Sequence, residues 1–336
     1  MSHRLSLRRA AVAALATLSV ALALPAAAQK TVEFRYGHMN PPNSAAGMQA
    51  QMLADAIAKN TSGQVKVTVY PSSQLGKLQE LAEAVSTGTI ALSHNTAGGI
   101  GSLHEPFGAL DTPYLYRDVD HLMKVMDVNS PVMKKLNEGL IKAAGVRVLY
   151  AYYFGTRQLT ANKAVKAPAD LSGQKIRAIP FPIYMAAVEG MGAIPVPVDW
   201  SEVPTALATG QVQGQENPVN VVLSSKLYEK QSHMMLTSHI MNAQLIVINE
   251  KAWQALSPEQ RDGIAKAAAE VRTKATEMVR SQEAEETDKL RGLKMTVIGP
   301  SDGLQIDAFR TSVNKLVQSK FGSKFGDLYK DIAAVK

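Results

Sequence analysis

A stretch without glycine or proline limits the possible folds of this chain more than any other feature. The segment SPEQ at 257–260 has a hydroxyl at the N-cap, a proline in the first turn and an amide three residues after the cap, which together form a capping box. After Gly263, neither glycine nor proline occurs until Gly292. At 1.5 Å per residue, one continuous helix would be roughly 50 Å long, more than the width of one lobe. We therefore expect a helix that spans two lobes; two helices broken near Ser281, where charge density rises, are the alternative.

Strands alternate with helices along the rest of the chain. Residues 31–36 alternate as a strand does, residues 48–58 carry apolar side chains at helical spacing, and residues 64–70 alternate again. This order favours a parallel sheet with crossover helices, and therefore an α/β fold. The same patterns predict a helix over 78–85 and strands over 90–93, 146–153, 175–179 and 245–249. The length of 336 residues allows two lobes, each with its own core.

The first 28 residues predict a secretory signal peptide. Three arginines at positions 4, 8 and 9 precede an apolar run over 10–24, and alanines at 26–28 form a small-residue cleavage site. The apolar run is too short to cross a bilayer of roughly 30 Å. The chain has no cysteine, which excludes disulfides and thiolate chemistry. We expect an exported protein of the periplasm.

Charge and motifs argue against several function classes. The formal net charge of +7 falls to +4 without the three arginines of the signal peptide, too small an excess for a nucleic-acid-binding surface. The sequence contains no Gly-x-Ser-x-Gly elbow, no Walker phosphate loop and no His-Glu-x-x-His metal helix. His233 and His239, six residues apart, do not share a helical face. We expect no nucleic acid, no metal and no cofactor.

One cation lies inside an apolar, strand-like run. In SGQKIRAIPFP, residues 172–182, Arg177 would share a strand face with Lys175 and Ile179, and Pro180 would end the pairing. Ligands bind at the carboxyl ends of strands in open α/β sheets. A guanidinium there, with no acidic residue in the stretch, suits a bidentate grip on a carboxylate or phosphate. The alternatives are a salt bridge to a distant carboxylate and a side chain that extends to water.

Several segments, in the expected order, resemble the solute-binding proteins of TRAP (tripartite ATP-independent periplasmic) transporters, the DctP-type family. They are VYPSSQLGK at 69–77, residues 152–180, residues 192–218 and LTSHIMNAQLIVIN at 236–249. The resemblance implies an α/β, two-lobed periplasmic binding protein fold, type II-like, with mixed sheets, a hinge between the lobes and a long helix that spans both. It also implies that the receptor closes on a small organic acid and passes it to the membrane permease subunits. We expect a monomer.

The expected lobes follow from this resemblance. Residues 29–153 and 243–281 would form the N-terminal lobe, while residues 154–242 and 282–336 would form the C-terminal lobe with the C-terminal helices. The chain would then cross between lobes near Phe154, Ala243 and Ser281, which predicts a hinge.

The resemblance also implies roles for individual residues. The family's principal carboxylate-binding arginine falls on Arg177, its second pocket arginine on Arg157 in GTRQ, and its pocket asparagine on Asn217 in QENP. Two guanidiniums and an amide can satisfy a carboxylate and a neighbouring hydroxyl or keto group. Trp200 falls where the family often has an aromatic wall, with core filling as the alternative. Further candidates are His38, Asn95 and Thr96 at strand ends, and the rings of Phe154 and Tyr184.

Departures from the family pattern restrict the substrate. Gln213 stands where many members have an aspartate, and residues 91–99 lack the acid that helps to hold the polar tail of sialic acid. Sialic acid is therefore disfavoured, and a hydroxylated acid such as a sugar acid is favoured over aromatic carboxylates.

Two other functions compete with transport. An exported sensor would share the ligand chemistry. A hydroxy-acid isomerase or lyase would need a general base, and Glu216 is the single acid expected beside the arginines, in a structural position. We therefore expect no enzymatic activity.

Overall fold

The computed structural model describes residues 31–336, so the predicted signal peptide at 1–28 lies outside the described residues. The strands of this part form one mixed sheet in the order β2-β1-β3-β8-β4-β7-β5-β6, with β9 beside β8. They are β1 (Val32–Gly37), β2 (Val65–Tyr70), β3 (Leu92–Thr96), β4 (Val146–Ala161), β5 (Lys175–Ala178), β6 (Ile194–Pro197), β7 (Gly214–Pro218), β8 (His233–Asn249) and β9 (Thr296–Ile298). The predicted α/β class is confirmed.

Helices cover both faces of the sheet. The α-helices are α1 (Ala45–Asn60), α2 (Leu78–Thr87), α3 (Ala97–Ile100), α4 (Val119–Val125), α5 (Pro131–Ala144), α6 (Pro182–Gly190), α7 (Val203–Ala208), α8 (Val219–Ser224), α9 (Glu250–Gln254), α10 (Pro258–Gly292) and α11 (Ile306–Ala334). Short 3-10 turns are η1 (Glu105–Asp111), η2 (Pro168–Leu171), η3 (Trp200–Glu202), η4 (Leu227–Glu229) and η5 (Pro300–Asp302). Within residues 31–336, no helix combines the length and the apolar content that a membrane crossing needs.

Two long strands join the halves of the sheet. β4 and β8 run antiparallel over almost their whole lengths; β8 pairs with β3 at one end and with β9 at the other, and β4 also pairs with β7. We call the part with β1, β2 and β3 the N-terminal lobe and the part with β5, β6, β7 and β9 the C-terminal lobe. The strands expected over 146–153 and 245–249 are thus parts of longer ones. The remaining parts carry buried polar side chains, such as Arg157 and Gln158, which conceal the apolar alternation of a strand.

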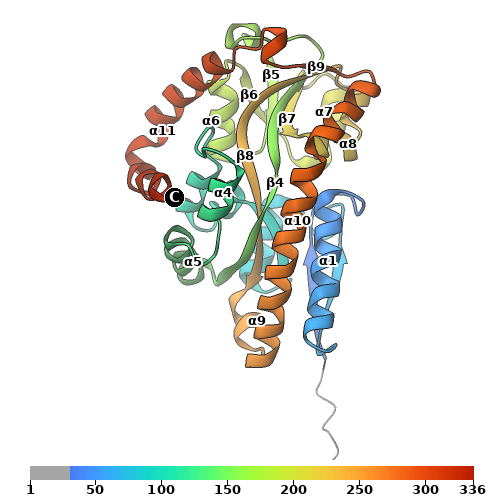
Figure 1. Cartoon of the computed structure of the whole chain (residues 1–336), viewed down its shortest axis with the longest axis vertical. Coiled ribbons are helices and arrows are strands. Elements are labelled where there is room, and N and C mark those ends of the chain that lie inside the picture. Colours follow the sequence, from blue (N-terminus) through green and yellow to red (C-terminus); the bar gives the residue numbers. More distant parts are fainter. Residues whose placement is uncertain (1–30) are drawn as a thin grey trace, which may run out of the picture.

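The long helix is continuous. The Ser257 hydroxyl accepts a hydrogen bond from the Gln260 amide N–H, and the Gln260 side chain accepts one from the Ser257 N–H, as the capping box predicts. The helix then runs to Gly292, so the alternative of a break near Ser281 is wrong. It contacts α1 in the N-terminal lobe and both α8 and β9 in the C-terminal lobe (Figure 1). The predicted helix that spans both lobes is confirmed.

Each lobe has its own hydrophobic core. One core gathers β1, β3, the first half of β4 and the last part of β8 with α1, α5 and α10. A second core gathers β5 and α6 with α11, the long C-terminal helix that packs along α6. A smaller third core lies around α7 and α8. Two lobes with separate cores, joined by continuous strands and one helix, leave a boundary between the cores where a ligand can bind.

Candidate functional site

A small cavity of about 40 Å³ lies between the lobes. Its N-terminal-lobe wall consists of Met39, Asn40, Leu78, Thr96, Phe154 and Gln244. Its C-terminal-lobe wall consists of Arg157, Arg177, Ile179, Pro180, Asp199, Trp200, Asn217 and Val221. Six of the nine predicted site residues therefore line this one cavity: Thr96, Phe154, Arg157, Arg177, Trp200 and Asn217.

Arg177 presents a free cation to this cavity. It lies on β5 and is 2% exposed. Its Nε donates to the Val198 carbonyl oxygen at 2.9 Å, and its guanidinium lies 5.7 Å from the centre of the Trp200 ring. Within residues 31–336, its two terminal nitrogens form no hydrogen bond and no ion pair. Burial lowers the pKa of Arg177 to about 10, since nothing nearby compensates the desolvated charge fully.

Arg157, on the same wall, is fully paired. Its Nε and Nη2 donate to the two carboxylate oxygens of Glu216, at 2.5 and 2.8 Å. Nη2 also contacts the side-chain oxygen of Asn217 at 3.1 Å, and Nη1 that of Asn242 at 3.2 Å. Burial alone would lower the pKa of Arg157, but attraction to Glu216 and its hydrogen bonds raise it. Its donors are already used by the protein, so Arg157 orders the wall.

A histidine completes this buried ion pair. His239 Nε2 lies 3.0 Å from a Glu216 carboxylate oxygen, and the other ring nitrogen lies 2.8 Å from the Thr237 hydroxyl. Burial alone would raise the pKa of Glu216, but Arg157 and the hydrogen bond from His239 lower it to about 2. The carboxylate therefore stays ionised at neutral pH and is occupied on both oxygens. Such a group is held in place as an anion and is a poor general base.

Asn217 and Trp200 are positioned by the C-terminal lobe. The Asn217 amide nitrogen donates to the Gln215 side chain, while its oxygen accepts from Arg157. Trp200 is half-buried and packs against the core of the N-terminal lobe as well as the small core around α7 and α8. The indole thus lies between two cores, with Arg177 against its face, and does not simply fill either core.

Three predicted site residues do not line the cavity. Tyr184 lies behind Arg157, with its ring 5.2 Å from the guanidinium and its hydroxyl donating to Asp111 at 2.7 Å. Asn95 is buried and donates to the Leu78 carbonyl oxygen at 2.8 Å. His38 is buried, and the centre of its ring lies 5.0 Å from that of His94. A strand alternates its side chains between two faces, and the sequence does not say which face borders the cleft.

One acidic residue that lines the cavity was not identified from the sequence. Asp199 lines the cavity, so the expectation that Glu216 is the single acid near the arginines is wrong. Its carboxylate accepts from Lys77 at 2.8 Å, and Lys77 also reaches Glu202 at 2.8 Å. Lys77 precedes α2 in the N-terminal lobe, whereas both acids belong to the C-terminal lobe. This ion pair therefore links the two lobes at the edge of the cavity. Asp199 directly precedes Trp200, which is the one signal in the sequence that could have revealed it.

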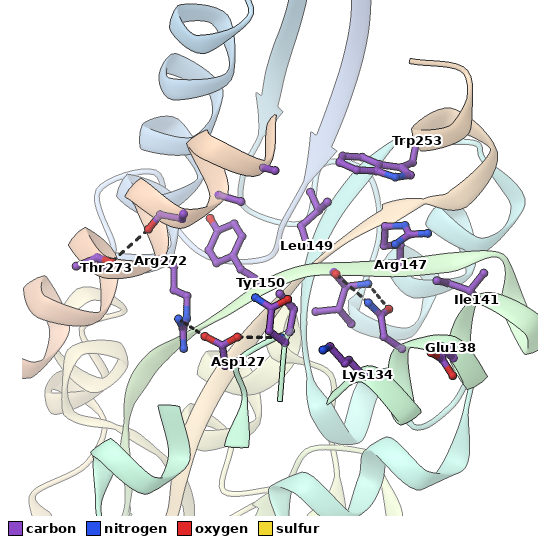
Figure 2. A pocket seen from close by; sticks show the side chains of 17 residues that line it. Asp127, Lys134, Glu138, Ile141, Arg147, Leu149, Tyr150, Trp253, Arg272 and Thr273 are labelled. Carbon is purple, nitrogen blue, oxygen red and sulfur yellow. Dashed lines mark hydrogen bonds and ion pairs between the residues drawn. The ribbon is translucent and has the colours of Figure 1, made fainter. Parts of the chain in front are cut away.

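A much larger hollow lies elsewhere, and both of its arginines have acidic partners. It measures about 650 Å³ and lies between α5, β4 and α10 (Figure 2). Arg147 there donates to both carboxylate oxygens of Glu250 and lies against the Trp253 ring, and Arg272 donates to Asp127 at 2.7 Å. Because its arginines are paired, the smaller cavity between the lobes is the better candidate site.

Two lobes around a cavity with one unpartnered guanidinium define the class of the protein: a two-lobed receptor for a small solute. Residues 36–324 match the model of the bacterial extracellular solute-binding proteins, family 7. The chain belongs to this family, whose members are receptors of TRAP transporters and not enzymes.

Relatives in this family cover nearly the whole chain. The sialic acid-binding periplasmic protein SiaP of Vibrio cholerae is 30% identical over 93% of this chain and 94% of its own length. The 2,3-diketo-L-gulonate-binding periplasmic protein YiaO of Escherichia coli is 32% identical over 85% of this chain and 86% of its own. The structure of a TRAP solute-binding protein from Polaromonas with bound D-erythronate superposes on this chain with a TM-score of 0.84. The two sequences are 29% identical, and the match covers 91% of this chain and 99% of the Polaromonas chain.

Proposed function

We propose that this protein binds a small hydroxylated organic acid through its carboxylate and delivers it to the TRAP permease in the membrane. The observation that carries the proposal is the free end of Arg177, a buried cation whose two terminal nitrogens face a cavity. A carboxylate can accept two parallel, charge-assisted hydrogen bonds from such a fork. Asn217 and the Trp200 ring flank the same position. Erythronate, bound by the Polaromonas protein, and diketogulonate, for which YiaO is named, are acids of this kind.

The proposal includes closure of the lobes about a hinge near Phe154, Ala243 and Ser281. Support comes from the irregularity of β4 between Tyr153 and Gly155, where the pairing with β8 shifts its register opposite Ala243. Gly155 has a φ of +119°, a conformation that other residues rarely adopt. Residues on α10 also reach this point, because Glu283 accepts hydrogen bonds from the Thr156 N–H and the Tyr153 hydroxyl, both at 2.9 Å.

A thermal-shift screen against organic acids tests the proposal directly. A ligand at 100 times its dissociation constant adds roughly 2.7 kcal/mol to the free energy of unfolding, which raises the melting temperature measurably. We expect hydroxylated monocarboxylates to raise it and the corresponding neutral sugars not to. Stabilisation by neutral sugars that equals stabilisation by acids would contradict recognition through the carboxylate.

A further inference from the structure

The N-terminal-lobe wall of the cavity is backed by a row of polar side chains on one sheet face. In the pairing of the strands, Thr96 of β3 lies opposite Gln244 of β8, and Gln244 lies opposite Tyr152 of β4. One step further from the cleft, on the same face, His94 lies opposite Ile246. Thr96 and Gln244 line the cavity, so this row begins at the ligand site and continues into the lobe.

The inner part of this face is satisfied by its own hydrogen bonds. The Tyr36 hydroxyl lies 3.0 Å from His94 Nδ1 and donates to Gln49 at 3.2 Å. Gln49 in turn donates to the Tyr150 hydroxyl at 2.6 Å. The other nitrogen of His94 lies 3.2 Å from the side-chain oxygen of Asn40, a cavity residue. Each of these buried groups has a partner, as buried polar groups normally do.

The outer part is not satisfied. Within residues 31–336, the Tyr152 hydroxyl, the Gln244 side-chain oxygen and both ring nitrogens of His38 have no hydrogen-bond partner. All three residues are at most 3% exposed. Tyr152 and Gln244 are direct neighbours on two paired strands. The Tyr152 hydroxyl could donate to the Gln244 side-chain oxygen, yet no hydrogen bond connects them. A hydroxyl group both donates and accepts, so one hydroxyl can satisfy both atoms at once.

This half of the cavity is also uncharged. The charged side chains of the described wall are Arg157, Arg177 and Asp199, and all three lie on the C-terminal-lobe side. Burial lowers the pKa of His38 to about 4, so its ring is neutral at neutral pH. A second carboxylate or an ammonium group placed here would be buried without an opposite charge, which is costly.

We propose that Gln244, Tyr152 and His38 form a neutral subsite that selects hydroxyl groups on the part of the acid remote from its carboxylate. The inference rests on the proposed function, because Arg177 fixes which end of the ligand reaches this wall. Gln244 contacts the ligand, while Tyr152 and His38 complete the hydrogen bonds behind it, directly or through water. The receptor therefore takes hydroxylated monocarboxylates and rejects dicarboxylates and amino acids.

Calorimetric titration with three four-carbon acids tests the subsite: D-erythronate carries hydroxyls, butyrate has none, and succinate has a second carboxylate. D-Gluconate and D-glucuronate are added as longer hydroxylated acids. We expect the best hydroxylated acid to bind about 100-fold more tightly than butyrate or succinate, because a site built for hydroxyls rejects analogues that lack them. Tyr152→Phe and Gln244→Leu should each reduce the advantage over butyrate by about tenfold. Tyr152→Phe removes a buried atom without a partner, so the melting temperature of the ligand-free protein should hold or rise.

Tyr150→Phe is the matched control, because the Tyr150 hydroxyl is already bonded to Gln49. It should lower the melting temperature and leave the preference among the acids unchanged. If butyrate or succinate binds as tightly as every hydroxylated acid, or if Tyr152→Phe and Gln244→Leu leave the preference intact, the subsite is wrong, while binding of an organic acid through its carboxylate stands. If no acid of the panel or of the thermal-shift screen binds the wild type, the proposed function itself fails and the subsite with it.

Discussion

Arg157 and Arg177 lie on the wall of one cavity, and both are buried, yet their surroundings are opposite. Arg157 donates to both carboxylate oxygens of Glu216 through Nε and Nη2, while Arg177 makes one bond to a backbone carbonyl and leaves its terminal nitrogens free. Accordingly, Glu216 raises the pKa of Arg157 against the effect of burial, whereas burial prevails at Arg177 and lowers its pKa. Breaking the paired charge would leave an uncompensated ion in the interior, whereas the unpaired charge already costs stability and has its terminal nitrogens available to a ligand.

The largest expected effect is the loss of ligand affinity in Arg177→Ala. Removing one partner of a desolvated ion pair costs roughly 3 to 5 kcal/mol, which weakens binding by about two to four powers of ten. Arg177→Lys should also bind poorly, because an ammonium group cannot reproduce two parallel hydrogen bonds. Calorimetric titration with the best acid of the thermal-shift screen measures both variants. Near-normal affinity of Arg177→Ala would mean that Arg177 is not the arginine that binds the ligand and does not differ from Arg157 in this respect.

The second effect is a loss of stability in Arg157→Met. This change leaves the buried Glu216 carboxylate its contact with His239 but removes the guanidinium that is bonded to both its oxygens, and we expect the free energy of unfolding to fall by about 3 to 5 kcal/mol. Urea denaturation without ligand measures it. The matched control is Arg177→Met, which removes an unpaired cation of the same size and should leave stability unchanged or higher. If Arg177→Met is destabilised as much as Arg157→Met, Arg177 has a structural partner after all.

The third effect is a dependence of stability on acid pH that arises from the pair of Arg157 and Glu216 and not from Arg177. The pKa of Glu216 is about 2 in the folded protein and 4.5 as the ordinary value. The unfolded chain therefore takes up this proton first as the pH falls, so the stabilisation is complete above pH 4.5 and is lost as the pH approaches 2. Its size is on the order of 3 kcal/mol.

Urea denaturation at a series of pH values across this window checks the assignment. Glu216→Gln should show a shallower fall of stability with acid than the wild type, and Arg177→Met should follow the wild type. A curve for Arg177→Met as shallow as that for Glu216→Gln would show that the acid response does not belong to Arg157 and Glu216.

The smallest effect concerns the ion pair of Lys77 with Asp199. Both side chains are partly exposed, 40% for Lys77 and 30% for Asp199, so solvent screens their attraction. Lys77→Met should weaken ligand binding at most a few-fold, and small-angle scattering should show a more open ligand-free protein that still closes with saturating ligand. A large loss of affinity would instead indicate that Asp199, once released from Lys77, takes Arg177 as its partner and competes with the ligand.

Much of the fold can be predicted from sequence because its signals are local. The capping box before α10 and the absence of glycine and proline after Gly263 specify the helix without reference to the rest of the protein. Apolar alternation likewise specifies β1 and β2 to within one residue at each end. Prediction fails at the second half of β4 and the first half of β8, because their buried polar side chains are stabilised by partners distant in sequence.

The sequence by itself was enough to place Arg177 near the end of a strand and to mark Arg157 as a second candidate arginine of the site. It did not determine which of them is free. Glu216 is 59 residues from Arg157 along the chain and meets it because β7 pairs with β4, with Glu216 opposite Leu159. Tyr152 and Gln244 likewise become neighbours through the register of β4 with β8. Hydrogen-bond partners across a sheet are set by long-range pairing, and local propensity carries no information about that pairing.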